Sequence, residues 1–266
     1  MQPFDQSNEI HVYQLPSDLS SRYEASHFEN IEKIESSHFW FSARREKICA
    51  AFNKFIPKGA SVLEVGGGTG YVARRLQELG YDITVGDMHL EGLLYAQKKG
   101  VRKLCQFDLL NPPFQKQFDV VCLFDVLEHI QDDALALEAI QTMLKSRGKV
   151  VMTVPAHKWL WSRDDVIAGH YRRYEHKKLS QLLIKSGFRI VTMQYFFKSI
   201  LPLLFIRRWM RRDSKKGLSQ GEKIDFSLHR SMNWILSQLM RLEMSFDWAL
   251  PNIAGGSLFV IAELKD

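Results

Sequence analysis

The chain has 266 residues, 45% of them hydrophobic, which is enough for one large domain with an elaboration. Its composition is ordinary and no low-complexity run or repeat occurs, so an intrinsically disordered chain is excluded. We find no apolar stretch of about 18 residues and no amino-terminal signal pattern, so we expect a cytoplasmic protein without a membrane span. The three cysteines (Cys49, Cys105 and Cys122) are scattered, which predicts free thiols and no metal site.

The positive charge is concentrated in one segment. The whole chain carries a net charge of +6, but from His170 to Arg230 there are 15 Lys and Arg against 4 Asp and Glu, or +11. The remaining residues therefore sum to −5. Such a segment predicts an anionic partner, which would be a phosphate group, a nucleic acid or a membrane surface.

The hydrophobic pattern predicts strands that alternate with helices. Residues 37–56 form an amphipathic helix with an aromatic start, which Pro57 and Gly59 end. Strands are then expected at 60–66, 82–87, 101–108, 118–125 and 148–155, and helices at 70–80, 89–100 and 132–148. This alternation indicates a parallel sheet that is covered on both faces, where ligands bind at the carboxyl ends of the strands.

The remainder of the chain departs from that alternation. Next come a polar, aromatic loop (156–175), a helix (176–188), a strand (189–196) and a last strand (256–264). We expect a doubly wound, Rossmann-like α/β fold of seven strands, mostly parallel with an antiparallel last strand.

Three regions follow from this pattern. They are a helical extension at 1–58, the sheet domain at 59–197 plus 255–266, and a helical insertion at 198–254. A plain doubly wound fold has no need of the insertion.

A glycine-rich turn follows the first strand of the sheet. Gly66, Gly67, Gly68 and Gly70 would let the backbone approach a ligand, and the helix that follows offers free N–H groups. Tyr71 stands where a dinucleotide fingerprint has Gly or Ala, which excludes that motif. A phosphate-binding P-loop is also excluded, because no Gly-Lys-Ser/Thr follows.

Three acidic residues complete this pattern. Glu64 precedes the first glycine, Asp87 ends the second strand and Asp108 ends the third. A carboxylate in the position of Asp87 can accept hydrogen bonds from both ribose hydroxyls. Each acid alone is often a loop or capping residue, but three at successive strand ends favour a binding site beside an adenine nucleoside.

The motifs E-x-G-x-G-x-G and F-D-V-V-x-x-x-D-V-L-E-H resemble those of class I S-adenosylmethionine-dependent methyltransferases, in a bacterial branch that acts on small molecules. The resemblance covers roughly residues 35–195 and the last strand. It implies that the glycine turn holds the methionine part of S-adenosylmethionine. It further implies that Asp87 binds the ribose and that Met88, Asp108 and Leu109 bind the adenine. Phe124 would lie beside the cofactor. Arg44 would bind the carboxylate of the cofactor, or else is an exposed helix arginine.

Two stretches near the fourth strand contain residue types that are common in active sites. Asn111-Pro112-Pro113-Phe114 resembles the tetrapeptide of adenine methyltransferases but precedes the strand instead of following it, so we interpret it as a turn. Glu128 and His129 do follow the strand and therefore lie at the reactive end of the sheet. His129 is a candidate general base, or else fixes the loop.

A second pattern follows the fifth strand and resembles W-S-x-x-D and G-H-x-R-R-Y of one bacterial branch. We expect it to bind the acceptor, with His170 as a second candidate base and the arginines as an anion clamp. Its members are Trp161, Asp165, His170, Arg172, Arg173 and Tyr174. Alternatively, Asp165 forms an ion pair that stiffens the loop, and Tyr174 caps the next helix.

Two apolar segments with basic neighbours, 196–212 and 231–250, dominate the insertion. They could form a lid, a face that lies on an anionic membrane, or a dimer interface. One helical face would carry Met232, Ile235, Leu236, Leu239, Leu242 and Phe246. A nucleic-acid surface fits less well, because the basic residues adjoin aliphatic runs rather than spaced aromatics.

We therefore predict methyl transfer from S-adenosylmethionine to an oxygen, or less readily a nitrogen, of a small-molecule or lipid-linked acceptor. The protein would be cytoplasmic, with peripheral contact at the inner face of the membrane. Two alternatives remain open: a cofactor-binding module without catalysis, and a methyltransferase of tRNA or another nucleic acid.

Overall fold

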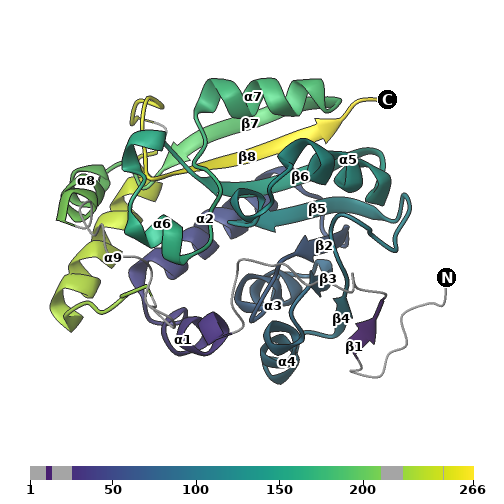
Figure 1. Ribbon diagram of the computed structural model, residues 1–266, viewed down its shortest axis with the longest axis horizontal. Coiled ribbons are helices and arrows are strands. Elements are labelled where there is room, and N and C mark those ends of the chain that lie inside the picture. Colours follow the sequence, from purple (N-terminus) through teal and green to yellow (C-terminus); the bar gives the residue numbers. More distant parts are fainter. Residues whose placement is uncertain (1–9, 14–25, 211–223, 248) are drawn as a thin grey trace.

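The computed structural model describes residues 10–13, 26–210, 224–247 and 249–266, and its centre is an eight-stranded sheet (Figure 1). From one edge to the other, the strands are β1 (Ile10–Val12), β4 (Lys103–Gln106), β3 (Asp82–Asp87), β2 (Ser61–Val65), β5 (Phe118–Phe124), β6 (Leu144–Pro155), β8 (Ser257–Leu264) and β7 (Phe188–Phe196). Only β8 runs antiparallel to its neighbours.

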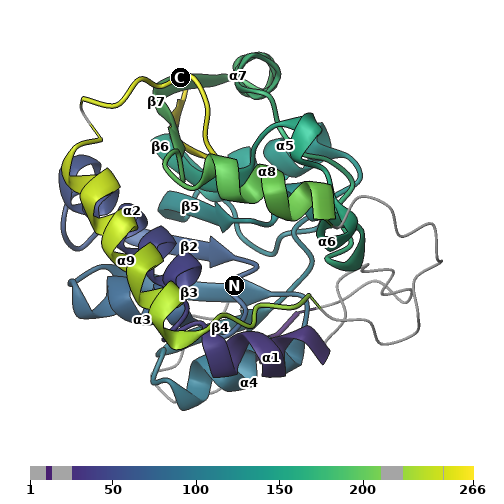
Figure 2. The same cartoon turned by 90° about the vertical axis from the view of Figure 1, so that its left-hand side faces the viewer.

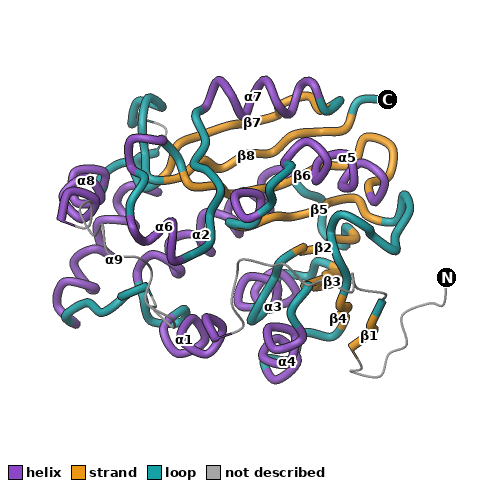
Figure 3. Tube along the Cα trace, in the orientation of Figure 1, coloured by secondary structure: helices purple, strands orange, loops and turns teal. Residues whose placement is uncertain are grey.

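Helices cover both faces of the sheet (Figure 3). One face carries α2 (Phe39–Phe55), α3 (Tyr71–Glu78) and α4 (Leu90–Lys98), and the other carries α5 (Asp133–Met143) and α7 (His176–Lys185). The central strands are buried along almost their whole length because both faces are covered. Successive residues still alternate between the two cores, so that Val62 belongs to one and Leu63 to the other.

The remaining helices surround the carboxyl ends of the central strands. They are α1 (Ser26–Ile34), α6 (Arg163–Ile167), α8 (Leu201–Met210) and α9 (Arg230–Ser245). The first packs on α4 and the last on α2, whereas α8 contacts the 3₁₀ turn at Lys158–Leu160. Figure 2 shows α8 and α9 together on one side of the molecule.

The predicted fold class is confirmed, but three local predictions are wrong. The sheet has an eighth strand, because Ile10–Val12 pairs in parallel with β4. The helix expected at 132–148 ends at Met143, and β6 begins at Leu144, which pairs with Phe118. The loop expected at 156–175 contains α6, because Ser162 and Asp165 form a capping box that starts a helix.

The predicted helices of the insertion exist, and most of the predicted apolar face of α9 is exposed. Leu236, Met240 and Glu243 are buried, whereas Met232 and Leu242 are exposed. The buried Glu243 accepts hydrogen bonds from the backbone amides of Lys198 (2.9 Å) and Ser199 (2.8 Å), next to the start of α8. Residues 211–223 of the predicted insertion lie outside the described residues.

Asn111 ends a turn, and the two prolines after it lie in the irregular segment that leads to β5. The amide of Asn111 donates to the carbonyl oxygen of Asp108 at 3.0 Å, which closes the turn before β5. Phe114 is buried edge-on against Phe107 and Phe118, with ring centroids 5.5 and 5.2 Å apart. The tetrapeptide therefore has a packing role at this position.

Within the ranges described above, every helix is too short or too polar to cross a membrane.

Candidate active site

A pocket of about 860 Å³ opens at the carboxyl ends of the central strands. One end is lined by the glycine turn between β2 and α3, together with residues that follow β3 and β4. The other end is lined by apolar side chains of α8 and α9, including Leu203, Leu204 and Leu236. Its size and mostly apolar walls are typical of a small-molecule site.

The glycine turn adopts a backbone that other residues would strain. Gly66, Gly68 and Gly70 have φ angles of 66°, 50° and 73°, in the left-handed region. A Cβ at Gly66 would also lie 2.6 Å from Val126, and one at Gly70 would lie 2.7 Å from Ala96. The turn therefore packs closely between the segment after β5 and α4, and it presents its backbone and the start of α3 to the pocket.

Asp87 at the end of β3 fixes the shape of this turn. Its carboxylate accepts hydrogen bonds from the backbone amides of Gly68 (2.9 Å) and His89 (2.8 Å). Burial raises the pKa of Asp87, and these two amides oppose the rise. Because the side chain also lines the pocket, it can accept further hydrogen bonds there.

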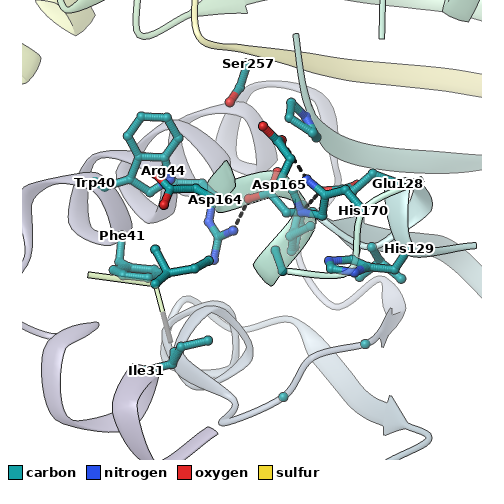
Figure 4. Close-up of a pocket in the computed structure, with 18 of the residues that line it drawn as sticks. Ile31, Trp40, Phe41, Arg44, Glu128, His129, Asp164, Asp165, His170 and Ser257 are labelled. Carbon is teal, nitrogen blue, oxygen red and sulfur yellow. Dashed lines mark hydrogen bonds and ion pairs between the residues drawn. The ribbon is translucent and has the colours of Figure 1, made fainter. Parts of the chain in front are cut away.

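The other predicted cofactor residues lie around the same end. Six of them line the pocket: Gly67, Met88, Asp108, Leu109, Phe124 and Arg44. Arg44 is not exposed on its helix, because it pairs with Asp125 after β5 and packs against Phe41 (Figure 4). The carboxylate of Asp125 also accepts a hydrogen bond from Thr153 Oγ1 at 3.0 Å.

Glu64 is the third acid of the sequence pattern and lies buried under the turn. Burial raises the pKa of Glu64 to about 8, although the charge of Arg44 opposes the shift. Among the described residues, none donates a hydrogen bond to its Oε2 atom. The burial of Glu64 therefore lowers the stability of the folded protein by an amount that increases with pH.

Replacing Glu64 with glutamine should flatten the pH dependence of stability in the ligand-free protein. The pKa of Glu64 is about 8 in the folded state against the ordinary 4.5, so its favourable contribution is complete below pH 4.5 and is lost as pH rises to about 8. The loss is on the order of 4 kcal/mol. Chemical unfolding at pH 5 and pH 9 would measure it, with Glu138→Gln on the exposed side of α5 as control. An equal pH dependence in Glu64→Gln and wild type would contradict the assignment.

On the acceptor side, Asp165 joins three other residues. Its carboxylate accepts hydrogen bonds from the Ser162 amide (2.8 Å) and from Arg173 Nε (2.8 Å), and it contacts His170 Nδ1 at 2.9 Å. Burial favours its neutral form, but the hydrogen bond to His170 and the charge of Arg173 prevail and lower the pKa of Asp165. The expected ion pair thus exists, and it also orients His170 (Figure 4).

Glu128, His129 and His170 meet in the wall of the pocket. Glu128 is fully buried, and His170 Nε2 lies 3.9 Å from its Oε1 atom. The rings of His129 and His170 stand edge to face, with centroids 4.7 Å apart. Burial, and after it the charge of Asp125, raise the pKa of Glu128 well above its usual range.

The structure does not bring all of the expected acceptor residues to the pocket. Trp161, Arg172 and Tyr174 lie outside the lining, whereas His170, Asp165 and Arg173 belong to it. Arg172 and the hydroxyl of Tyr174 both contact Asp133, at 2.9 and 3.0 Å. These two side chains therefore join the loop to α5.

Several pocket residues have no counterpart in the sequence interpretation. Glu35 accepts a hydrogen bond from Thr69 of the glycine turn at 2.5 Å, and Arg207 of α8 pairs with Asp164 of α6 at 3.0 Å. Phe28 and Ser257 also line the pocket. Pairing between distant segments makes these residues part of the site, and no local motif signals it.

The fold and the glycine turn with its three acids define a class I methyltransferase. The chain belongs to the methyltransferase-domain family, whose model matches residues 40–193. The predicted class of protein, a methyltransferase, is therefore confirmed.

Curated relatives match a shorter stretch. A ubiquinone biosynthesis O-methyltransferase of Acinetobacter baumannii is 33% identical over 100 residues, covering 35% of this chain and 42% of the relative. The Xanthomonas oryzae protein of the same name is 29% identical over 102 residues, covering 36% and 43%. The matched stretch thus spans about two fifths of these relatives' length.

Solved structures share the fold at low identity. A Haloferax volcanii methyltransferase solved with its Trm112 activator has a TM-score of 0.59 and 15% identity, over 91% of this chain and 94% of that one. Phosphoethanolamine N-methyltransferase 2 of Haemonchus contortus, in complex with S-adenosyl-L-methionine, has a TM-score of 0.55 and 19% identity, over 83% and 53%.

Proposed function

We propose that the protein transfers the methyl group of S-adenosylmethionine to an oxygen atom of a largely apolar acceptor, either a small molecule or a lipid-linked one. The observation that carries this proposal is one continuous pocket with three kinds of wall. The glycine turn and the apolar side chains of α8 and α9 line the same pocket as a cluster of one buried acid and two partly buried histidines. This order suits a cofactor and an apolar acceptor that react where they meet.

At the cofactor end, we expect the glycine turn and the start of α3 to hold the methionine part. The carboxylate of Asp87 would accept the ribose hydroxyls, as its place at the end of β3 favours. The adenine would lie among Met88, Asp108 and Leu109, with Phe124 and Glu64 beneath the sulfonium. Arg44 would share its charge between Asp125 and the cofactor carboxylate.

At the reacting centre, the enzyme must align the acceptor and exclude water, because the departing sulfur becomes neutral. An oxygen acceptor must also lose a proton, which requires a group that makes this loss easier. Glu128, His129 and His170 line the pocket at this point, and Asp165 fixes the ring of His170. The names of the curated relatives, O-methyltransferases, also favour oxygen.

The apolar end favours an acceptor with a hydrocarbon chain. Leu203 and Leu204 of α8, Leu236 of α9 and Phe226 before α9 line it. Arg207 ties α8 to α6 through Asp164 at 3.0 Å, so α8 is held across this end as a lid would be. We propose that α8 and α9, the described helices of the predicted insertion at 198–254, form this lid over the sheet domain.

The proposed activity is tested with purified protein and two linked assays. Calorimetric titration should detect S-adenosylmethionine and not NAD. Mass spectrometry should then detect an O-methylated product from a diphenol with an isoprenoid chain, and much less from the same diphenol without the chain. Binding of the cofactor without methylation of any oxygen would leave a binding module, and methylation of phosphoethanolamine alone would indicate a nitrogen acceptor.

The outer side of the lid also favours contact with an anionic bilayer. Trp209 of α8 and Trp234 of α9 are 68% and 63% exposed, and both helices carry further exposed apolar side chains. The two helices lie on the same side of the molecule (Figure 2). Arg208 and Arg230 belong to the same helices. Exposed aromatic residues with neighbouring cations are typical of helices that lie in a membrane interface.

Vesicle sedimentation tests this contact. We expect the protein to sediment with vesicles that contain phosphatidylglycerol and to be released by high salt, because the attraction is partly electrostatic. Replacing Trp209 and Trp234 with serine should abolish sedimentation, whereas Leu135→Ser on α5 should not. If wild type and the double variant both remain in the supernatant at low salt, the membrane contact is wrong. If gel filtration shows that wild type is a dimer and the double variant is a monomer, the exposed face binds a second copy of the chain instead of a membrane.

A further inference from the structure

Three potential metal ligands converge in the acceptor part of the pocket. Glu128 and His129 come from the 3₁₀ turn after β5, and His170 comes from the loop after α6. One donor atom from each of the three lies within 4.8 Å of the others. Figure 4 shows the three side chains together on the wall opposite Arg44.

Glu128 has a carboxylate that the surrounding protein leaves unsatisfied. It is fully buried and lines the pocket, yet neither oxygen accepts a hydrogen bond from another residue in the described part of the chain. Its nearest basic contact is His170 Nε2, at 3.9 Å from Oε1. A buried polar group without a partner is costly, and an ion that binds there removes the cost.

His170 is oriented as metal-binding histidines are. Asp165 contacts its Nδ1 atom at 2.9 Å, so in the neutral ring this nitrogen carries the hydrogen and Nε2, on the side of Glu128, is the atom that can bind a metal. Arg173 and the Ser162 amide hold Asp165 in place at 2.8 Å each. A carboxylate that fixes the second nitrogen of a ligating histidine is a recurrent feature of metal centres.

The neighbouring charges allow a cation at this position. Arg44 is paired with Asp125, and Arg173 is paired with Asp165, so these two pairs are each close to neutral. Glu128 would release its proton when the cation binds, because a metal ligand must be deprotonated. Cations in such sites lie about 2.0–2.2 Å from nitrogen and oxygen ligands, so binding would draw the three donor atoms closer together.

We propose that Glu128, His129 and His170 bind a divalent first-row cation, which takes the acceptor oxygen as a further ligand. Two imidazoles and one carboxylate suit such cations and leave coordination positions open. This inference rests on the proposed function, because it requires an oxygen acceptor. Under this inference His170 does not act as a general base, because its Nε2 atom binds the cation.

The cation would lower the pKa of the acceptor hydroxyl, which gives its proton to solvent. The resulting oxygen then forms a bond to the methyl carbon as the carbon–sulfur bond breaks. The electron pair of that bond stays on sulfur, which leaves as the neutral thioether S-adenosylhomocysteine. Charge and atoms therefore balance without any further reactant.

The site can be tested without knowing the acceptor. Protein treated with EDTA and then freed of it should bind one Mn²⁺ per chain, as measured by electron paramagnetic resonance of the unbound ion. Glu128→Gln and His170→Gln should abolish binding, while Asp165→Asn should weaken it roughly 10- to 100-fold. Glu138→Gln on α5 and His176→Gln on α7, outside the pocket, are matched controls that should bind as wild type does. Circular dichroism establishes that each variant is folded.

Two results would overturn the site. One is wild-type protein that binds neither Mn²⁺ nor Zn²⁺ at millimolar concentration and neutral pH. The other is methyl transfer to oxygen that persists undiminished in EDTA, which would leave the proposed function intact and return His170 to the role of base. Mn²⁺ binding that Glu128→Gln abolishes, in a protein that methylates no oxygen, would support the site and refute the proposed function.

Discussion

Replacing Asp87 with alanine should weaken binding of S-adenosylmethionine by about 1.5–3 kcal/mol, which is roughly 10- to 150-fold in Kd. The carboxylate lines the pocket at the end of β3, where it can accept charge-assisted hydrogen bonds from the ribose. It also holds the glycine turn through the amide of Gly68 at 2.9 Å. Alanine removes both contributions, and calorimetric titration measures the loss.

Two comparison variants separate these contributions. Asp82→Ala lies at the other end of the same strand, where Asp82 pairs with Lys103 at 2.7 Å, and it should leave the affinity unchanged. Asp87→Asn keeps an oxygen that can accept the Gly68 amide hydrogen, so it should lose less than Asp87→Ala. Wild-type affinity in Asp87→Ala would remove this residue from the cofactor site.

Replacing Asp165 with alanine should destabilise the folded protein by on the order of 3 kcal/mol. Asp165 is almost completely buried and is the shared partner of Arg173, His170 and the amide that begins α6. Its removal leaves the guanidinium of Arg173, which is mostly buried, without a counter-charge. The midpoint of denaturant unfolding, measured at neutral pH, should fall accordingly.

A double variant distinguishes the ion pair from the capping interaction. Asp165→Ala combined with Arg173→Met removes both charges, so part of the stability should return. Ser162→Ala removes only a capping side chain and should cost about 1 kcal/mol. If the double variant is no more stable than Asp165→Ala, the buried arginine charge is not the cause of the loss.

The sequence predicts most of the sheet because its strands are buried on both faces. Continuous apolar runs such as β5 allow few other interpretations. The three-residue strand β1 is too short to show a period, and it exists through pairing with β4. The sequence predicts too long a helix for α5, because residues 144–147 contain no residue that ends a helix. In the structure the helix ends earlier, because Leu144 pairs with Phe118 in the sheet.

The cofactor end of the site was accessible to sequence reasoning because the geometry of a parallel sheet gathers strand ends. Glu64, Asp87 and Asp108 come from separate strands and meet in one pocket for this reason. The acceptor end depends on pairs that no local pattern encodes. Asp125 has a φ of 57° and binds Arg44, a residue from a helix outside the sheet.

The apolar face of α9 shows the same limit. A hydrophobic pattern cannot register that Glu243 is buried, because its partners are backbone amides before α8. Nor can it register that Asn233 bonds α9 to the start of α2, at 2.9 Å from the Phe39 amide. A hydrophobic pattern therefore predicts which residues share a face of α9, but not that Glu243 is buried while Met232 and Leu242 are exposed.

The position of α1 has a consequence for the speed of turnover. Phe28 packs so closely on the glycine turn that a Cβ at Gly68 would lie 3.1 Å from its ring, and Glu35 ties the same turn to the segment after α1. Under the proposed function, S-adenosylhomocysteine would have to leave past α1, which these contacts fasten to the turn. Such exits require a conformational step, which is often slower than bond making. We expect the steady-state rate to be governed by product departure, so that acceptors of very different reactivity would be consumed at similar rates.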